Sequence, residues 1–381
     1  MNALALLFLL AFLVSVDLRI IAPVLPSITE SLRASAGSIG LAMTSYAFAY
    51  GAGQLVYGPL SDRHGRVAVV RAAAVGFSVC TALSALSATT WQFVAARLLA
   101  GAFAGAVIPL TLVHIGDTVE YARRQVMVAR FSIVTSAGLA FSAAIGGLVA
   151  HFVSWRAMLV GYALIALVPS ALLWRLPPGT PVRPPGDVRP VARFADFLMD
   201  PFGRLVYVSI FAEGFLLWGA VAYLGAYAAA EYGMSQLEVG LLFALFGVGT
   251  MVGGALMGPL RRRLSERGLA RGGGLVMGLS LLMLVPTGPW PIFGAAMLLL
   301  GLGFVGLHTT LQVYGTEISQ AARGKAFSLF PASLFLGMAL GTAVMGPLVD
   351  AGGERVVLAV SGVGLAAVGA VTARIRRRRS A

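Results

Sequence analysis

Long apolar stretches, each cut off by charged residues or by Gly and Pro clusters, recur along the whole chain. A helix needs about 20 mostly apolar residues to cross a bilayer. The pattern predicts twelve such helices, at residues 4–25, 38–60, 68–88, 91–115, 128–151, 156–175, 203–229, 235–260, 271–288, 290–314, 325–349 and 353–373. The first stretch also has the apolar core of a signal peptide, but no Lys or Arg precedes it and no small-residue cleavage site follows. We therefore expect a retained helix.

Basic residues fall mainly between alternate pairs of these stretches, and cytoplasmic loops of membrane proteins collect Lys and Arg. With the N-terminus inside, only Arg33, Arg156 and Arg355 lie on the outer side, while Arg19 and Arg97 lie within apolar stretches. The sequence therefore predicts an inner-membrane protein with both termini in the cytoplasm, and a basic cytoplasmic tail at residues 374–379.

Composition supports lipid as the solvent. Of 381 residues, 58% are hydrophobic and only 11% are charged, against roughly 25% charged in an average soluble domain. A net charge of +13 would suggest nucleic-acid binding in a soluble protein. Here the excess marks the cytoplasmic face, so we expect no nucleic-acid partner. A lone Cys80 excludes an internal disulfide or a Cys-rich metal site, and the four scattered histidines argue against a transition-metal site.

Residues 176–202 separate two halves and begin with a Pro-rich run that cannot form a helix interior. We predict a six-helix bundle at residues 1–175, a cytoplasmic linker at 176–202, and a second six-helix bundle at 203–381. The halves repeat at an offset of 200 positions: Gly58, Gly101, Asp117, Arg123 and Gly146 match Gly258, Gly301, Glu317, Arg323 and Gly346. Parallel six-helix repeats are typical of transporters that bind substrate between the halves near the midplane.

The loop Gly58-Pro59-Leu60-Ser61-Asp62-Arg63-His64-Gly65-Arg66 resembles the signature loop of the major facilitator superfamily. Arg97-Leu98-Leu99-Ala100-Gly101, continued to Gly105, resembles that family's fourth-helix motif, with Ala100 in place of Gln. Residues from Gly138 to Gly146-Gly147 resemble the fifth-helix motif of its twelve-helix drug–proton antiporter branch, although Ser142-Ala143 replaces the characteristic Gly-Pro pair. The resemblance implies an all-α fold of two pseudo-symmetric six-helix bundles.

The signature loop is also a candidate conformational latch. A carboxylate at Asp62 would be favoured by the dipole at the N-terminus of the eleventh helix, near Lys325, and opening the inner side would break that contact. A solvated loop with no such role is the alternative. The resemblance implies the latch role for Asp62, Gly65 and Arg66, and we place Gly58 and Arg63 with them.

Asp17 is the most informative residue because a carboxylate within a span costs roughly 2.5–3.5 kcal/mol unless it is paired or wet. At about 1.5 Å per residue, Asp17 and Arg97 reach the same depth in their helices, so we expect them to pair. Arg19 is an alternative local partner. Protonation of Asp17 would release Arg97, which makes this pair a candidate proton switch; a purely structural ion pair is the alternative.

Glu213 lies near the midplane of the seventh helix and is followed by Trp218 and Tyr223. An acid beside aromatic rings suits a lipophilic cation, although aromatic residues on membrane helices more often pack. We assign Glu213 to proton coupling with Asp17 and Arg97. The candidate substrate cavity comprises Asp17, Arg19, Glu213, Trp218, Tyr223 and His308, with a hydrogen-bonded core histidine as the alternative for His308.

Small residues four positions apart indicate close helix contacts. We assign this packing role to Gly101, Gly105, Gly138, Gly146, Gly147, Gly337 and Gly341, and we expect the same of the Gly254/Gly258 pair. Gly301-Leu302-Gly303-Phe304-Val305-Gly306 matches a dinucleotide-binding pattern but lies in an apolar helix without a preceding strand. We therefore expect no cofactor, and a proton gradient as the energy source.

These features predict a secondary active transporter that works by alternating access, and that exports a small amphipathic or cationic compound in exchange for protons. Proton symport or facilitated uptake of a small metabolite is the alternative within transport. A membrane sensor or a membrane-embedded enzyme is the alternative outside it, but no nucleophile–base pair is visible. We expect small-molecule substrate, protons and lipid as partners, and a monomer.

Overall fold

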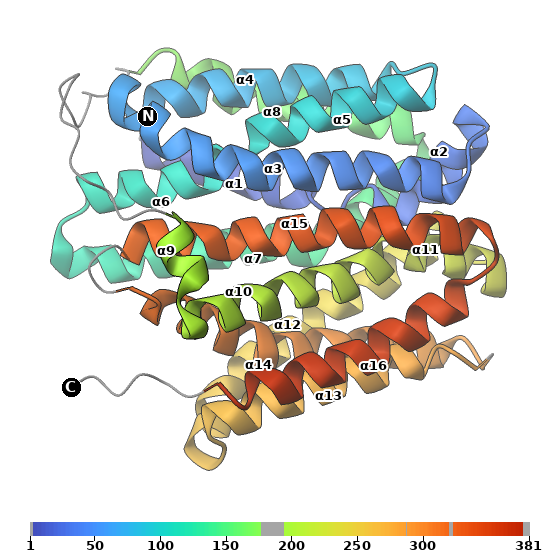
Figure 1. The fold of residues 1–381 in the computed structure, drawn as a ribbon. Helices are drawn as coiled ribbons and strands as arrows, with labels where there is room; N and C mark the ends of the chain where they lie inside the picture. Colours follow the sequence, from blue (N-terminus) through green and yellow to red (C-terminus); the bar gives the residue numbers. More distant parts are fainter. Residues whose placement is uncertain (1–2, 177–193, 287, 320–322, 376–381) are drawn as a thin grey trace. The chain divides into compact units, whose positions relative to one another are not determined.

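The computed structural model describes residues 3–176, 194–286, 288–319 and 323–375. Within those ranges it contains helices and no strand. The chain forms two compact units (Figure 1). Unit 1 comprises Met1–Arg189 with Ser235–Gly240, and unit 2 comprises Pro190–Met234 with Leu241–Ala381.

The helices of unit 1 are α1 Ala3–Asp17, η1 Ala22–Val24, α2 Leu25–Leu32, α3 Ala36–His64, α4 Arg66–Ala85, α5 Thr90–Ala104, α6 Val107–Thr118, α7 Tyr121–Phe152 and α8 Trp155–Leu173. Those of unit 2 are α9 Phe194–Met199, α10 Pro201–Glu213, η2 Gly214–Trp218, α11 Gly219–Tyr232, α12 Gln236–Arg263, α13 Glu266–Leu282, α14 Pro291–Glu317, α15 Arg323–Asp350 and α16 Glu354–Thr372. The first residues of α12 belong to unit 1.

Each of the twelve predicted apolar stretches is mainly helical. In the described part of the chain, nine helical segments are long and apolar enough to cross a membrane. The stretches in α3, α7 and α13 are not among the nine, so their membrane crossing stays a prediction.

Two of the predicted helices are interrupted. The stretch at 4–25 is not one helix, because α1 ends at Asp17 and a turn at residues 18–21 leads into η1 and α2. Pro23 explains the break, since proline lacks the N–H of a helix interior and its ring clashes with the carbonyl four residues earlier. The stretch at 91–115 is likewise divided into α5 and α6 after Ala104.

The Pro-rich part of the predicted linker lies outside the described residues. The last part of the predicted linker contains helix α9, Phe194–Met199, which packs on α10. The seventh predicted helix starts at Pro201, two residues earlier than expected, where the Asp200 carboxylate accepts a hydrogen bond from the N–H of Gly203 at 2.9 Å. This is the usual capping arrangement of a helix N-terminus.

The offset-200 repeat extends to three-dimensional contacts. In unit 1, α5 crosses α3 where Gly101 faces the backbone of Tyr46; in unit 2, α14 crosses α12 where Gly301 faces the backbone of Phe246. Positions 46 and 101 correspond to 246 and 301. The same pairs of helices therefore meet at the same residues in both halves, as internal duplication requires.

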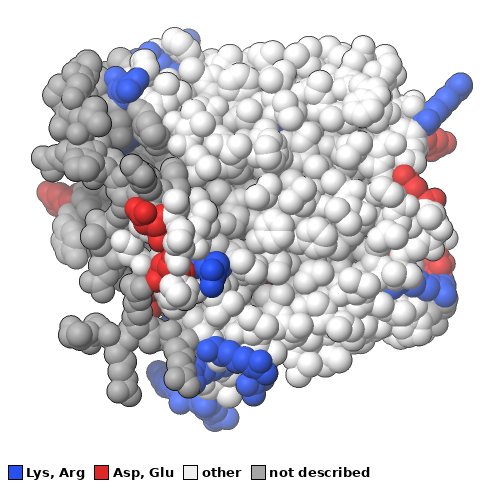
Figure 2. Space-filling view, viewed as in Figure 1, with Lys and Arg blue, Asp and Glu red and all other residues white. Residues whose placement is uncertain are grey.

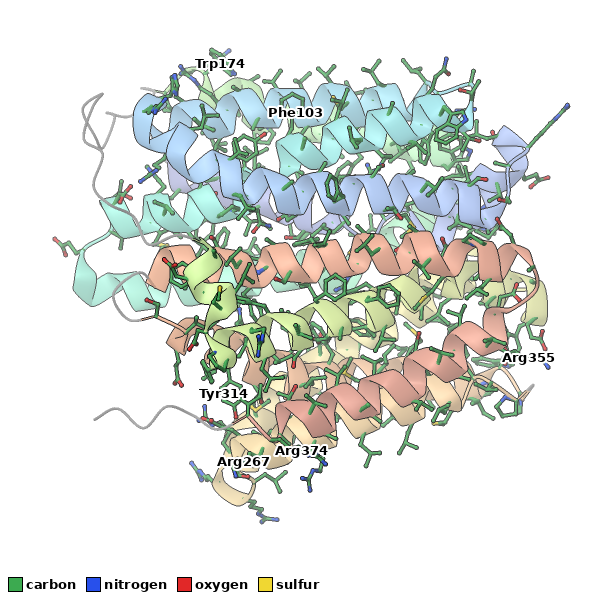
Figure 3. All side chains as sticks on the ribbon, in the orientation of Figure 1. Phe103, Trp174, Arg267, Tyr314, Arg355 and Arg374 are labelled. Carbon is green, nitrogen blue, oxygen red and sulfur yellow. The ribbon has the colours of Figure 1, made fainter. Side chains whose placement is uncertain are left out.

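Charge is concentrated near helix ends. In the space-filling view the lateral helix surfaces are largely free of Lys, Arg, Asp and Glu (Figure 2). Within unit 2, Arg355 lies at one end of the helices, and Arg267 and Arg374 lie at the opposite end (Figure 3). The predicted assignment of Arg355 to the opposite side of the membrane from Arg267 and Arg374 agrees with this arrangement. An uncharged lateral surface suits the hydrocarbon of a bilayer.

Candidate functional site

Unit 1 contains a buried ion pair between α1 and α5. The guanidinium of Arg97 contacts both carboxylate oxygens of Asp17, with Nη1 3.1 Å from Oδ1 and Nη2 2.9 Å from Oδ2. The Asp17 side chain is 0% exposed and that of Arg97 is 3% exposed. The expected contact between these residues is therefore present, in the bidentate geometry in which Arg and carboxylate bind most strongly. Arg19 lies half-buried on the turn that follows Asp17.

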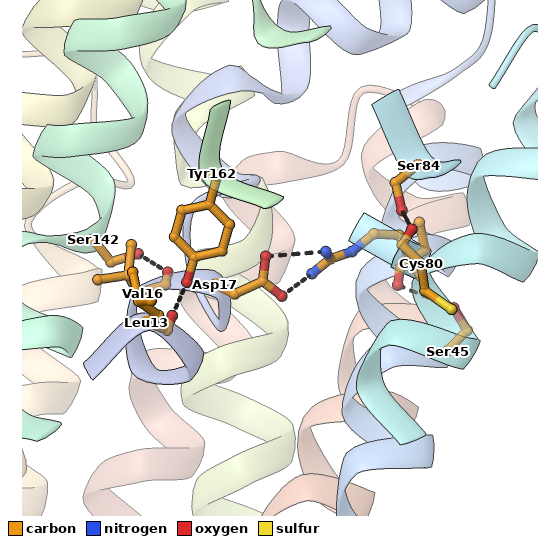
Figure 4. A network of polar contacts seen from close by, with 10 residues as sticks. Leu13, Val16, Asp17, Ser45, Cys80, Ser84, Ser142 and Tyr162 are labelled. Carbon is orange, nitrogen blue, oxygen red and sulfur yellow. Dashed lines mark hydrogen bonds and ion pairs between the residues drawn. The ribbon is translucent and has the colours of Figure 1, made fainter. Parts of the chain in front are cut away.

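Hydrogen bonds from two other helices hold the end of α1 that carries Asp17. The hydroxyl of Tyr162 on α8 donates to the carbonyl of Leu13, and the hydroxyl of Ser142 on α7 donates to the carbonyl of Val16 (Figure 4). The Val16 carbonyl also accepts a hydrogen bond from the backbone N–H of Arg19 at 3.3 Å, so the Ser142 hydroxyl adds a second donor at this helix end. Ser142, which departs from the family's Gly-Pro pattern, thus anchors the backbone beside the ion pair.

An aromatic ring covers Arg97. The guanidinium carbon lies 4.3 Å from the centroid of Tyr46, a residue of α3 that sequence reasoning did not single out. The Tyr46 hydroxyl and the Nε of Arg97 are buried and have no hydrogen-bond partner. The offset-200 match of Tyr46 with Phe246 was the one signal in the sequence that could have drawn attention to this position.

Unit 2 contains a second acid–base contact. Nδ1 of His308 on α14 lies 3.2 Å from Oε2 of Glu213, the last residue of α10. The Glu213 side chain is 0% exposed and that of His308 is 17% exposed. Directly after Glu213 the backbone forms the π-helix η2, a wider turn that often marks functional sites.

Aromatic rings extend from this second contact. Phe304 stacks on His308 with ring centroids 4.5 Å apart, and Trp218 meets Phe304 edge-on at 5.7 Å. The predicted grouping of Glu213, Trp218 and His308 is thus present within one unit. Tyr223 has another environment, because its buried hydroxyl donates to the carbonyl of Thr342 at 2.8 Å. That bond packs α11 on α15, so we leave Tyr223 out of the functions proposed below.

The signature loop connects α3 to α4 at Gly65, whose φ of 89° is a backbone conformation that favours glycine. Arg66 contacts the Asp117 carboxylate through Nε at 3.2 Å, and its Nη1 donates to Ser61. The side chains of Asp62 and Lys325, the predicted latch partners, lie outside the described residues. Arg63 is exposed, and a Cβ added at Gly58 would meet no atom within 4 Å.

Most of the small-residue positions lie at close helix contacts. An added Cβ at Gly101 or Gly105 would collide with the backbone of Tyr46 or Tyr50, and one at Gly337 or Gly341 with that of Phe211 or Phe215. Gly138, Gly146 and Gly147 face, in turn, Phe12, Ile20 and Gln236. Gly254 and Gly258 are different, because a Cβ at either would meet nothing within 4 Å. The expectation for that pair was wrong, since four-residue spacing shows only that two glycines share a face.

Among the described residues, no three His, Cys, Asp or Glu side chains are close enough to hold a metal ion. In the part of the chain that the structure describes, each unit contains one buried acid–base contact, Asp17–Arg97 or Glu213–His308.

Comparison with known proteins identifies the family. The family model of the Major Facilitator Superfamily matches residues 7–330 and 206–381. The chain belongs to the major facilitator superfamily. It is a multi-pass membrane transporter and not an enzyme.

The chain is similar to members of the superfamily that have different names. The chain is 25% identical to the uncharacterized MFS-type transporter YceJ of Bacillus subtilis, over 91% of this chain and 89% of that one. It is 28% identical to a chloramphenicol resistance protein of Pseudomonas aeruginosa, over 76% and 71%. The crystal structure of a D-xylose–proton symporter superposes with a TM-score of 0.76 at 18% identity, covering 97% of this chain and 95% of that one. This last likeness shows the fold.

Proposed function

We propose that the chain is a proton-coupled exporter of a small amphipathic or cationic compound, and that Asp17 and Arg97 form its proton-sensitive pair. The observation that supports this most strongly is the bidentate, buried contact between the two side chains. A fully buried ion pair is weak evidence for stability, because desolvation of two charges offsets most of their attraction. A switching role is a better reason for it to be there.

The pair is sensitive to one proton. While Asp17 is ionised, its charge is balanced by Arg97 and both oxygens are bonded. When Asp17 takes up a proton, Arg97 keeps its charge in a buried position without a counter-ion, because arginine does not deprotonate in proteins. The conformation in which both residues are buried then becomes unfavourable by several kcal/mol. Protonation therefore favours a conformation in which Arg97 meets water or another partner, as alternating access needs.

Export is supported by the similarity of this chain, over 76% of its length, to a chloramphenicol resistance protein. The aromatic rings of Trp218 and Phe304 suit a cationic or amphipathic compound. We propose the inner membrane as the location, with both termini in the cytoplasm, and a monomer as the working unit. The signature-loop residues Asp62, Gly65 and Arg66 are proposed to act as a conformational latch.

The experiment is reconstitution into phospholipid vesicles with a trapped pH dye, followed by addition of ethidium, tetraphenylphosphonium and a panel of sugars. Antiport predicts that entry of a cation makes the vesicle interior more alkaline, whereas symport predicts acidification and a facilitator gives no proton signal. Asp17→Asn should abolish the proton signal. Glu231→Gln, which alters an exposed ion pair with Arg355, is the matched control and should behave as wild type. Unchanged uphill transport by folded Asp17→Asn would refute the role of the pair.

A further inference from the structure

The side chain of Glu213 is buried and contacts His308. Its side chain is 0% exposed, its Oε1 is buried without a hydrogen-bond partner, and its Oε2 contacts Nδ1 of His308 at 3.2 Å. A buried carboxylate with an unbonded oxygen is costly when ionised unless a positive charge stands beside it. One proton on the pair removes this cost in either of two forms: Glu213 carboxylate with His308 imidazolium, or Glu213 carboxylic acid with neutral imidazole.

The two ring nitrogens of His308 have different surroundings. Its Nδ1 contacts Glu213 and its side chain is 17% exposed, so Nε2 is the ring nitrogen that Glu213 does not engage. Phe304 stacks on one face of the ring at 4.5 Å, and Phe330 on α15 lies edge-on at 5.9 Å. These contacts hold the plane of the ring and keep Nδ1 aimed at the carboxylate.

Other titratable groups lie away from the pair. On α10 and α14 the nearest along the helix are Tyr207 and Tyr314, each six residues from its member of the pair, about 9 Å. Arg204 and Glu317 are nine residues away, about 14 Å. Tyr223 on α11 is bonded to a backbone carbonyl. On the other helices of unit 2, residues 241–260, 272–282, 326–349 and 356–373 include no ionisable side chain. Among the described residues of unit 2, His308 is the ionisable side chain recorded in contact with Glu213.

We propose that His308 is the proton relay of Glu213. A proton from water binds Nε2 and makes the imidazolium; the proton on Nδ1 then passes to Oε2 of Glu213, leaving a neutral ring protonated at Nε2. Release follows the same steps in reverse, and no other reactant is needed. This deepens the proposed proton coupling by giving unit 2 a proton path of its own. It differs from the pair in unit 1, where Arg97 cannot relay a proton.

The test reads protonation directly and needs no substrate. The full chain in phosphatidylcholine and phosphatidylglycerol vesicles is subjected to a pH jump, and the carboxylic-acid C=O infrared band that Glu213→Gln removes is followed in time. A positioned general acid–base contributes on the order of a hundredfold or more to a proton transfer. We expect His308→Asn, whose amide can still bond Glu213, to slow the change of this band after the pH jump by about that factor. Free imidazole should restore the rate in His308→Ala.

His114→Asn on α6 is the matched control and should leave the rate unchanged. An unchanged rate in both His308→Asn and His308→Ala would overturn the relay, and so would the absence of any band that depends on Glu213. Because the readout is independent of flux, a protein that shows the relay but moves no protons with substrate would refute the proposed antiport and leave this inference standing.

Discussion

Asp17→Asn should destabilise the protein far more than loss of an exposed ion pair. The substitution leaves the Arg97 charge buried, with its side chain 3% exposed and its Nε already without a partner. Removal of one partner from a buried pair typically costs about 3–5 kcal/mol, because the other charge stays desolvated. A second substitution, Arg97→Gln, removes that charge. The double variant should therefore be less destabilised than the sum of the single variants, by about 1–3 kcal/mol.

The free energy of unfolding is measured in mixed micelles by titration with a denaturing detergent, with Trp fluorescence as the signal. Glu231→Gln is the control, since Glu231 and Arg355 lie 2.8 Å apart but are 25% and 52% exposed. Exposed pairs contribute roughly 0.2–1 kcal/mol. A cost below about 1 kcal/mol for Asp17→Asn, or strict additivity of the two substitutions, would refute the claim that the charges are desolvated and coupled.

Three further predictions test the packing. Gly101→Ala and Gly301→Ala should each lower the thermal midpoint in detergent, because the new methyl group meets backbone across a helix crossing, whereas Gly116→Ala should not, since nothing lies within 4 Å of that site; equal midpoints in all three would contradict the close crossings. Tyr223→Phe should cost about 1 kcal/mol in the same detergent titration, because it removes the hydrogen bond from the Tyr223 hydroxyl to the Thr342 carbonyl. Arg156→Gln should make the backbone amides around residues 85–87 exchange hydrogen faster, because its guanidinium binds the carbonyls of Ala85 and Ser87; unchanged exchange would rule out that anchoring.

The sequence alone was enough to predict where most of the helix lies, the duplication, and Arg97 as a partner of Asp17, but not the breaks after Asp17 and Ala104. Hydrophobic length decides which segments become helices in a membrane, because every backbone polar group must be bonded within the segment. Because the halves repeat at a fixed offset of 200 residues, a pair of positions in one half predicts the corresponding pair in the other. Depth along two helices is set by the constant rise per residue, so two opposite charges at equal depth were predictable as partners.

Only the tertiary structure decided which side chains surround those charges. The contacts of Tyr46 with Arg97, Ser142 with Val16 and His308 with Glu213 depend on how each helix is rotated about its axis, and that rotation follows from packing against neighbours. For the same reason, Gly101 lies at a crossing and Gly258 in open space, although each belongs to a pair of glycines four residues apart. Helical periodicity defines a face, but the partner of that face comes from the rest of the fold.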